Sequence, residues 1–496
     1  MSNYENFDET PKTQKKSVLE DVSSRCCEKD YKTFDDGFLK FENNTIEFIY
    51  CIEKNHSLEK NPAMAKSYNL QTQITTKYGT SFWTSVLRLL LLTSATPIFM
   101  IPSVLISAGY LTGSVLLLVV VCFYLHNMHM VVWSAEKISK LNSDVDVVYS
   151  DLLYGALKLE RAWVGPWLGS FIRVMSTFII CLTWYSVCIF VYLFAAENVQ
   201  TICNKWFYCE LTIENTLLIL LLPALVLSFI SRAEYLESFA AFGFLCNLIS
   251  LILVACCVLL DPSPWMLADA DGSLKKPLFI GILLINLSVT PAVLLFKNET
   301  KNTRKFNSAG GVLNISYVGI FIIYLTFSLL YGLKYGNDLP INSIILLPDN
   351  NIITQVCPIF YGLGLICVYP HLYCGLLDLI ARDIFQDKLE YKSRQLTFST
   401  NIFKLFGVLI CCLVTYLRPS LLLYLSLGGT ICTSIDSIIY PALVHTIVYW
   451  KVSKSKLAFA LVVIKNLIIL AIGVNLVVVG VEDCMWFVNN SGVLLV

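Results

Sequence analysis

Long apolar segments separated by short polar ones fill the chain after its first 80 residues. About eleven of them reach roughly 20 residues, the length that an α-helix needs to cross the hydrocarbon core of a membrane. They cover residues 83–108, 111–133, 168–196, 214–231, 238–260, 277–296, 311–332, 352–380, 398–416, 420–449 and 457–480. The pattern predicts an all-α polytopic membrane protein with about eleven transmembrane helices.

Composition supports this prediction and excludes other classes. Hydrophobic residues make up 56% of the 496 residues and charged residues only 15%, whereas soluble domains carry about 25% charged residues. The 36 basic and 36 acidic residues balance, so no basic surface for nucleic acid is indicated. The lipid bilayer is therefore the first partner that the sequence predicts.

Three regions differ in polarity. Residues 1–80 mix charges with Asn, Ser and Thr, which predicts a disordered cytosolic tail without a cleavable signal sequence. Residues 81–480 form the predicted transmembrane domain, and residues 481–496 a short extracytosolic C-terminal tail.

Charges between the apolar segments predict the orientation. With the N-terminus in the cytosol, the inner loops hold sixteen Lys and Arg residues and the outer loops five, as the positive-inside rule requires. An outer loop then carries Cys203 and Cys209, as a disulfide or as two free thiols. The sequon at Asn489 also lies outside and is a candidate glycosylation site.

Two apolar segments share a Ser-x-Thr-Pro motif, TSATP at 93–97 and LSVTP at 287–291. Proline removes a backbone donor and interrupts a helix. The motifs lie in the first and sixth predicted spans, and an offset of five spans reverses direction. This predicts an inverted five-plus-five repeat with broken helices 1 and 6, the usual location of a transporter's substrate site.

Each break offers backbone groups to a small zwitterion. Thr is a good N-cap and Pro a good first helical residue, so a second half-helix would start at each motif with unpaired N–H groups for a carboxylate. The preceding carbonyls suit an ammonium group. A pair of simple proline kinks is the alternative. The candidate substrate residues at the breaks are Ser94, Thr96, Pro97, Ile98, Phe99, Ser288, Thr290 and Ala292.

Ionisable residues at membrane depth are candidates for function. Asp436 in the tenth span is a candidate proton carrier, or a neutral acid bonded to Ser434 or Ser437. His371 is a second proton-coupling candidate, or a structural histidine. Arg88 would pair with Asp436 or, as we expect, extend to the inner surface.

Other residues have a weaker basis in the sequence. Tyr185, beside Trp184, is a candidate wall of the substrate site. His126 and His129 stand three residues apart without an acid or cysteine, so we expect interfacial anchors rather than a metal site. Since paired CxxC motifs are also absent from the sequence, no metal or other cofactor is expected.

Several stretches together resemble the amino acid/auxin permease family, within it the animal, insect-like proton-coupled amino acid transporters. They are IPSVLISAG (101–109), HNMHMVV (126–132), CLTWYSVCIFVYLFAAENVQ (181–200), LLPALVL (221–227), LKYGNDL (333–339), VYP (368–370) and SLGGTICTSIDSIIYP (426–441). The resemblance implies a LeuT-like five-plus-five core with an eleventh helix, and transport of small neutral amino acids, often with protons. Tyr369, within VYP, joins the substrate candidates.

The chain departs from that family at both breaks. The usual Gly-Thr-Gly of helix 1 is Ala95-Thr96-Pro97 here, and the acidic residue usual in helix 6 is absent. Glycine lets a substrate approach the backbone closely, so these changes bear on substrate range and on coupling.

Two functions follow. The first is a secondary active transporter that works as a symporter, with small neutral amino acids as substrates and protons as the candidate coupled ion. It would act in the plasma membrane or in a lysosomal or vacuolar membrane. The second is a non-transporting amino-acid sensor on the same fold. An enzyme is not expected, because the sequence shows no nucleophile–base pair, phosphate loop or metal cluster.

Overall fold

The computed structural model describes residues 80–95, 98–142, 147–159, 166–207, 210–230, 233–266, 268–269, 278–336, 339, 352–385, 394–417, 425–453 and 455–490. Except for Thr80, the predicted cytosolic tail lies outside these residues. Two isolated β-bridges, Thr80 with Thr300 and Met266 with Tyr335, stand beside a fold that is otherwise helical in the described residues.

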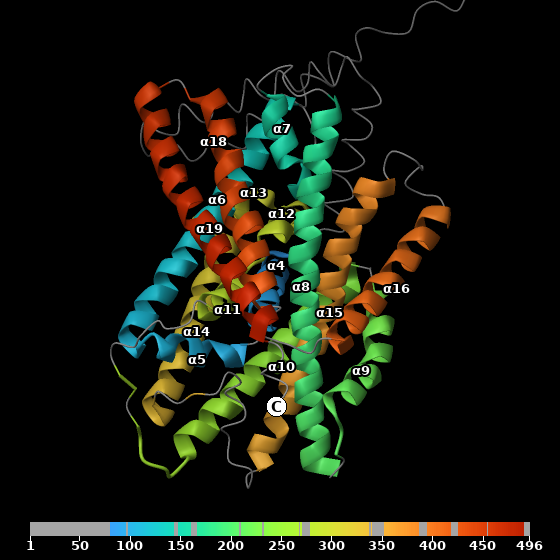
Figure 1. Ribbon diagram of the computed structural model, residues 1–496, viewed down its shortest axis with the longest axis vertical. Helices are drawn as coiled ribbons and strands as arrows, with labels where there is room; N and C mark the ends of the chain where they lie inside the picture. Colours follow the sequence, from blue (N-terminus) through green and yellow to red (C-terminus); the bar gives the residue numbers. More distant parts are fainter. Residues whose placement is uncertain are drawn as a thin grey trace, which may run out of the picture. The chain divides into compact units, whose positions relative to one another are not determined.

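The helices follow one another with short connections (Figure 1). In chain order they are α4 (Phe82–Ala95), η1 (Ile98–Met100), α5 (Ile101–Ser107), α6 (Tyr110–Asn142), η2 (Tyr149–Asp151), α7 (Leu152–Lys158), α8 (Pro166–Phe207), α9 (Ile213–Ser228), α10 (Ala233–Leu260), α11 (Leu278–Leu287), η3 (Thr290–Ala292), α12 (Val293–Glu299), α13 (Thr303–Phe306), α14 (Val312–Tyr335), α15 (Ile352–Phe385), α16 (Arg394–Leu417), η5 (Leu425–Cys432), η6 (Ile435–Ile439), α18 (Tyr440–Val452) and α19 (Lys456–Asn490).

The membrane-spanning prediction is confirmed. Among the described residues, eight helices are long and apolar enough to cross a membrane, and α4 with η1 and α5 forms a further span bent by 49°. Two shorter apolar helices are α9 and the Lys404–Leu417 part of α16. Nearly all described residues of the apolar windows are therefore helical, because a helix satisfies its own backbone hydrogen bonds in lipid.

Tyrosines are buried among aliphatic residues in the interior, while further aliphatic side chains face outward. Six tyrosines are among the largest fully buried side chains, and many Leu, Ile and Val residues are more than half exposed. Lipid is as apolar as these aliphatic side chains, so the exposed ones cost little in a membrane.

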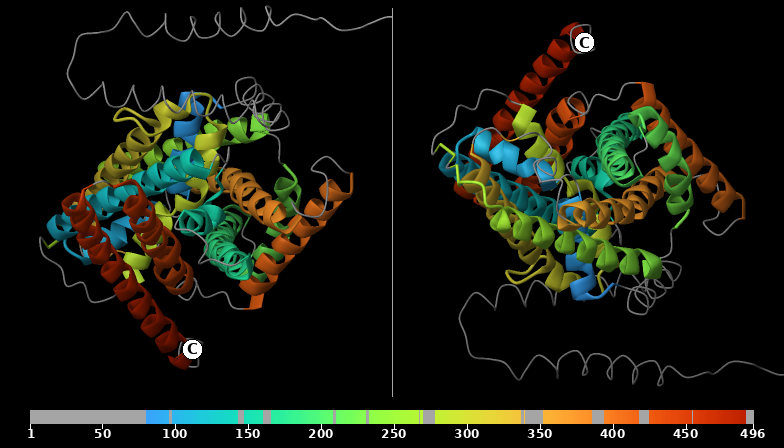
Figure 2. Two further views of the ribbon diagram at one scale, coloured as in Figure 1. Left: turned by 90° about the horizontal axis from the view of Figure 1, so that it is seen from above. Right: turned by 90° about the horizontal axis from the view of Figure 1, so that it is seen from below.

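The helices of the two broken spans, among them α4, α11 and α12, lie in the middle of the bundle (Figure 1). α18 and α19 lie at one side, and α9 and α16 at the opposite side (Figures 1 and 2). α8 runs through the bundle for 42 residues.

The last helix continues past its predicted end. α19 continues to Asn490, so residues 481–490 of the predicted tail are helical. Between Gly480 and Gly492 the sequence holds neither glycine nor proline to stop it, and adding a residue to an existing helix is easy. Asn489 is exposed on this last turn.

Candidate functional site

The break in the sixth span lies where the motif predicts it, with different capping. α11 ends at Leu287, and the chain is helical again from Thr290. The N-cap is Val289, with no side-chain cap bond. The prediction that Thr290 caps the second half-helix is therefore wrong, and its buried hydroxyl has no hydrogen-bond partner among the described residues.

The predicted free N–H groups after this break are also paired. Ala292 N–H donates to the Val289 carbonyl at 3.0 Å, and Val293 N–H donates to the Thr290 carbonyl. The first turn is a 3₁₀ turn, in which bonds to the third preceding residue satisfy donors that an α-helical start would leave free.

The break in the first span falls between α4 and η1, and Thr96 and Pro97 lie outside the described residues. On either side of it, Ser94 donates its hydroxyl to a carbonyl one turn earlier, at 3.5 Å. Ile98 and Phe99 are fully buried. The Phe99 ring contacts rings of α14 and α15 edge-on, with centroids 5.3 and 4.6 Å apart.

Two tyrosines of α14 bond to the backbone at both breaks. Tyr317 donates to the Leu287 carbonyl, the last of α11, at 2.9 Å, and Tyr324 donates to the Thr93 carbonyl near the end of α4. The two tyrosines are seven residues, or about two turns, apart on one helix face. Carbonyls that the sequence suggested for a substrate ammonium group thus already have donors from the protein.

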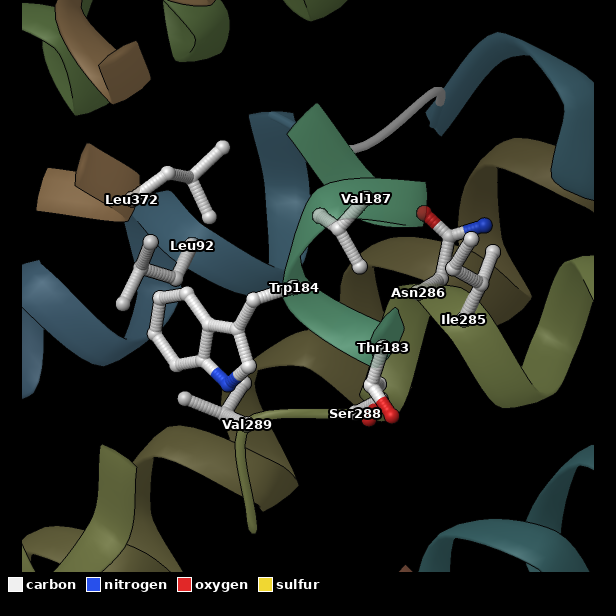
Figure 3. Close-up of a pocket in the computed structure, with 9 residues that line it drawn as sticks. All are labelled: Leu92, Thr183, Trp184, Val187, Ile285, Asn286, Ser288, Val289 and Leu372. Carbon is white, nitrogen blue, oxygen red and sulfur yellow. The ribbon is translucent and has the colours of Figure 1, made fainter. Parts of the chain in front are cut away.

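A small pocket lies between the broken spans, α8 and α15 (Figure 3). The pocket has room for about one water molecule. Trp184 lies across it beside Leu92 and Val289 (Figure 3). The residues that line it are Leu92, Thr183, Trp184, Val187, Ile285, Asn286, Ser288, Val289 and Leu372.

The polar atoms of this pocket are few and uncharged. The Asn286 amide donates to the Ile282 carbonyl at 2.7 Å, while its own buried oxygen has no partner in the described part of the chain. Ser288 and Thr183 supply hydroxyls. A site built this way offers hydrogen-bond acceptors without a fixed charge.

Asp436 connects to the pocket through hydroxyl groups. It lies in η6, 2% exposed, and its Oδ1 accepts from Ser437 Oγ at 2.7 Å. Ser437 Oγ lies 3.3 Å from Ser288 Oγ in the pocket wall. Because the Ser437 proton goes to Asp436, Ser288 donates to Ser437. The bond to Ser437 is one of the two alternatives that the sequence left open.

Three other candidates lie outside the pocket lining. Tyr185 Oη lies beside Gly407 of α16. The Tyr369 ring packs edge-on against Tyr192, with centroids 6.0 Å apart. His371 is buried beside Leu372, and its Nδ1 lies 3.2 Å from the Cys367 carbonyl oxygen.

The partner of Arg88 differs from what we expect from the sequence. Arg88 neither reaches the surface nor pairs with Asp436, because its Nη1 lies 2.5 Å from Glu299 Oε2 at the end of α12. Its guanidinium also lies over the Phe296 ring, 4.6 Å from the centroid. The side chain is 4% exposed and that of Glu299 35%. Glu299 follows the apolar window at residues 277–296, so the hydropathy pattern does not mark it as a partner for a residue inside the membrane.

Further bonds join the start of α4 to the end of α12. Thr80 N–H donates to the Glu299 carbonyl at 2.8 Å, and Lys301 N–H to the Thr80 carbonyl at 3.1 Å. Ser85 Oγ lies 2.8 Å from Thr80 Oγ1 and 3.0 Å from Thr300 Oγ1. These bonds and the Arg88–Glu299 pair form what we call the α4–α12 latch. The first and sixth spans, which run in opposite directions, thus meet at one face of the membrane domain.

A second ion pair supports α12 at this face. Lys297 Nζ lies 2.6 Å from Glu136 Oε1 of α6. Lys297 is 9% exposed, so the pair fixes α12 against α6 as well as against α4.

The remaining sequence candidates lie elsewhere. His129 lies between Asn307 and Asn314, while His126 Nε2 lies 3.0 Å from Lys465 Nζ; the two rings serve different partners. Cys203 lies on α8, and Cys209 lies outside the described residues, so their pairing stays a prediction.

Comparison with known proteins gives one family. The family described as transmembrane amino acid transporter protein matches residues 78–485. The proton-coupled amino acid transporter-like protein pathetic of Drosophila melanogaster is 21% identical over 323 residues, which are 64% of this chain and 67% of that protein.

Among solved structures, two are of a manganese transporter of Eremococcus coleocola. One is a complex with an aromatic bis-isothiourea substituted compound, at a TM-score of 0.40, and the other is a mutant, also at 0.40. Both are 11% identical and cover 82% of this chain, and 95% and 96% of their own chains.

Proposed function

The chain belongs to the transmembrane amino acid transporter family, and on that premise we propose that it carries small neutral amino acids across a membrane, coupled to protons, by alternating access. The observation that carries this proposal is the pocket at the break of the sixth span, which is also lined by the first span, α8 and α15. Binding sites of broken-helix transporters lie at such midplane breaks.

The pocket's chemistry suits an amino acid without a charged side chain. None of its lining residues is ionisable, and a charged substrate side chain would cost several kcal/mol there without a partner. The unpartnered Asn286 oxygen is an acceptor for the α-ammonium group. Thr96, Pro97, Thr290 and the other break residues remain candidates for the carboxylate.

The Ser288–Ser437–Asp436 chain supplies a coupling route. With Asp436 ionised, each hydroxyl donates toward it, so Ser288 has no proton to offer to the pocket. Protonation of Asp436 lets the hydroxyls reverse direction, so that Ser288 donates its proton into the pocket, where the substrate carboxylate can accept it. Proton binding at Asp436 thereby raises the affinity of the pocket for its substrate, as uptake stimulated by acid requires.

The α4–α12 latch supplies the closed gate at one face. Opening this face requires the two half-helices to separate, and the latch holds them with one ion pair, two backbone bonds and hydroxyl contacts. The pocket in this closed arrangement is smaller than an amino acid, so substrate entry needs such a movement. We assign the latch to the cytosolic face, with the N-terminus in the cytosol.

Uptake of radiolabelled neutral amino acids at external pH 5.5 and 7.4 tests the proposal, in cells that carry the protein at the surface or in vesicles of its own membrane. We expect saturable uptake stimulated by acid. Asp436→Asn should abolish the acid stimulation and Ser437→Ala should weaken it. Ser434→Ala is the matched control, because Ser434 is a fully buried serine of the same span.

The result also separates the alternative function. Binding of an amino acid without flux, measured on purified protein in vesicles of both orientations, would overturn the transport proposal and favour the non-transporting sensor. Flux that Asp436→Asn leaves stimulated by acid would overturn only the coupling route. Thr96→Val reports on the break of the first span, because it removes a hydroxyl and keeps the side-chain shape.

A further inference from the structure

Among the membrane-spanning helices that the structure describes, α19 has the most exposed apolar face. In its most apolar stretch only 17% of the residues are buried, against 44–78% in the other spans of the described chain. Leu461, Ile464, Leu467 and Ile468 are each more than half exposed there. Exposed aliphatic side chains fit lipid, so this face by itself indicates nothing further.

A lysine interrupts this face. Lys465 lies nine residues after the start of α19, about 14 Å along the helix axis. Its Nζ lies 3.0 Å from Nε2 of His126 on α6, itself exposed, and 3.4 Å from Met130 Sδ. The ammonium therefore points to the middle of α6 rather than to the near membrane surface.

No carboxylate balances this charge in the part of the chain that the structure describes. The ion pairs found there join other residues. On α18, His445 lies 3.1 Å from the amide of Asn466, the residue that follows Lys465. An ammonium has three donors, and an unpaired one at membrane depth costs several kcal/mol.

We propose that this face docks a transmembrane helix of a partner protein that carries Asp or Glu at the depth of Lys465. A carboxylate there would accept a hydrogen bond from the remaining N–H of the ammonium group. The exposed leucines and isoleucines around Lys465 would pack against the partner's apolar residues. His126 holds the ammonium in place as a hydrogen-bond acceptor.

Two other occupants fit less well. A lipid phosphate lies outside the hydrocarbon region, whereas Lys465 lies about 14 Å along α19 and points inward. A second copy related by a two-fold axis along the membrane normal would bring Lys465 against Lys465. The first acid on α19, Glu482, is 17 residues further along, about 26 Å away.

A synthetic leucine helix tests the proposal on the full protein in phosphatidylcholine vesicles. It carries one Asp about 14 Å from one end and a fluorophore, and its association is measured by energy transfer. Against this peptide we compare one with Asn in place of Asp, and one with Asp moved six residues. We expect about 5- to 30-fold weaker association for both, the range found for polar contacts between model membrane helices.

Variants of the protein make the test specific. Lys465→Met should reduce the affinity for the Asp peptide to that for the Asn peptide, and Lys456→Met, at the membrane edge, should leave it unchanged. Equal binding of the three peptides to the unaltered protein would overturn the proposal, whatever the variants do. Displacement of the Asp peptide by 20 mol% phosphatidylserine, with Lys465-dependent retention of that lipid, would overturn it in favour of a headgroup site.

Discussion

Removing the charge of Arg88 gives the sharpest test of the α4–α12 latch. Arg88→Gln keeps a polar side chain of similar reach but loses the ion pair with Glu299. A hydrogen bond to a charged group contributes about 2 kcal/mol, which is about a 30-fold change in an equilibrium constant. The loss stays below that for a fully buried pair, because Glu299 is 35% exposed and water takes over part of its charge.

Accessibility of the pocket from the latch face measures this shift. A Ser288→Cys protein is treated with a membrane-impermeant thiol reagent from that face, and mass spectrometry of the peptide containing residue 288 separates its labelling from that of native cysteines. We expect labelling about 30-fold faster when Arg88→Gln is added. Arg173→Gln is the matched control, because Arg173 forms an ion pair of the same 2.5 Å length with Asp151, away from α4 and α12.

A protein with the two charges exchanged completes a double-mutant cycle. Exchanging the partners, with Arg88→Glu and Glu299→Arg together, should restore part of the protection that each change alone removes. An unchanged labelling rate in Arg88→Gln, or an equal increase in Arg173→Gln, would show that the pair does not hold this face closed.

Three further predictions concern stability, each measured by thermal unfolding of purified protein in detergent. Tyr317→Phe leaves the last carbonyl of α11 without its donor and should cost about 1–2 kcal/mol; an unchanged transition would mean that water replaces the hydroxyl. Lys334→Met removes two 2.6 Å hydrogen bonds to the carbonyls that follow α10 and should lower the unfolding temperature; an unchanged temperature would show that these bonds do not stabilise the fold. Gly429→Ala should prevent folding, because a Cβ there would lie 2.4 Å from a backbone oxygen of α11, whereas Gly362→Ala, with nothing within 4 Å, should be tolerated.

Local patterns predicted the helices and the breaks well. Twenty apolar residues have few alternatives to a helix in lipid, because unpaired backbone groups are costly there. Proline likewise interrupts a helix wherever it stands, so LSVTP located the second break to within a residue or two. The capping at Thr290 was predicted wrongly, since a 3₁₀ turn competes with the side-chain cap and uses the same N–H groups.

The sequence pattern could not predict which residues from distant parts of the chain contact one another. Arg88 and Glu299 are 211 residues apart, and Ser288 and Ser437 are 149 apart; no periodicity relates them. Tyr317 and Tyr324 share a helix face in any helical reading, but the carbonyls that they bond to belong to other helices.

The sequence by itself therefore determined that this is a helical membrane protein with two broken spans, because hydrophobic length and proline act locally. Only the tertiary structure decided which polar groups meet inside the bundle: the Ser288–Ser437–Asp436 chain, the latch, and the contact of Lys465 with His126. Each of these depends on how helices from distant parts of the chain pack, and it is packing that brings their side chains within hydrogen-bond distance.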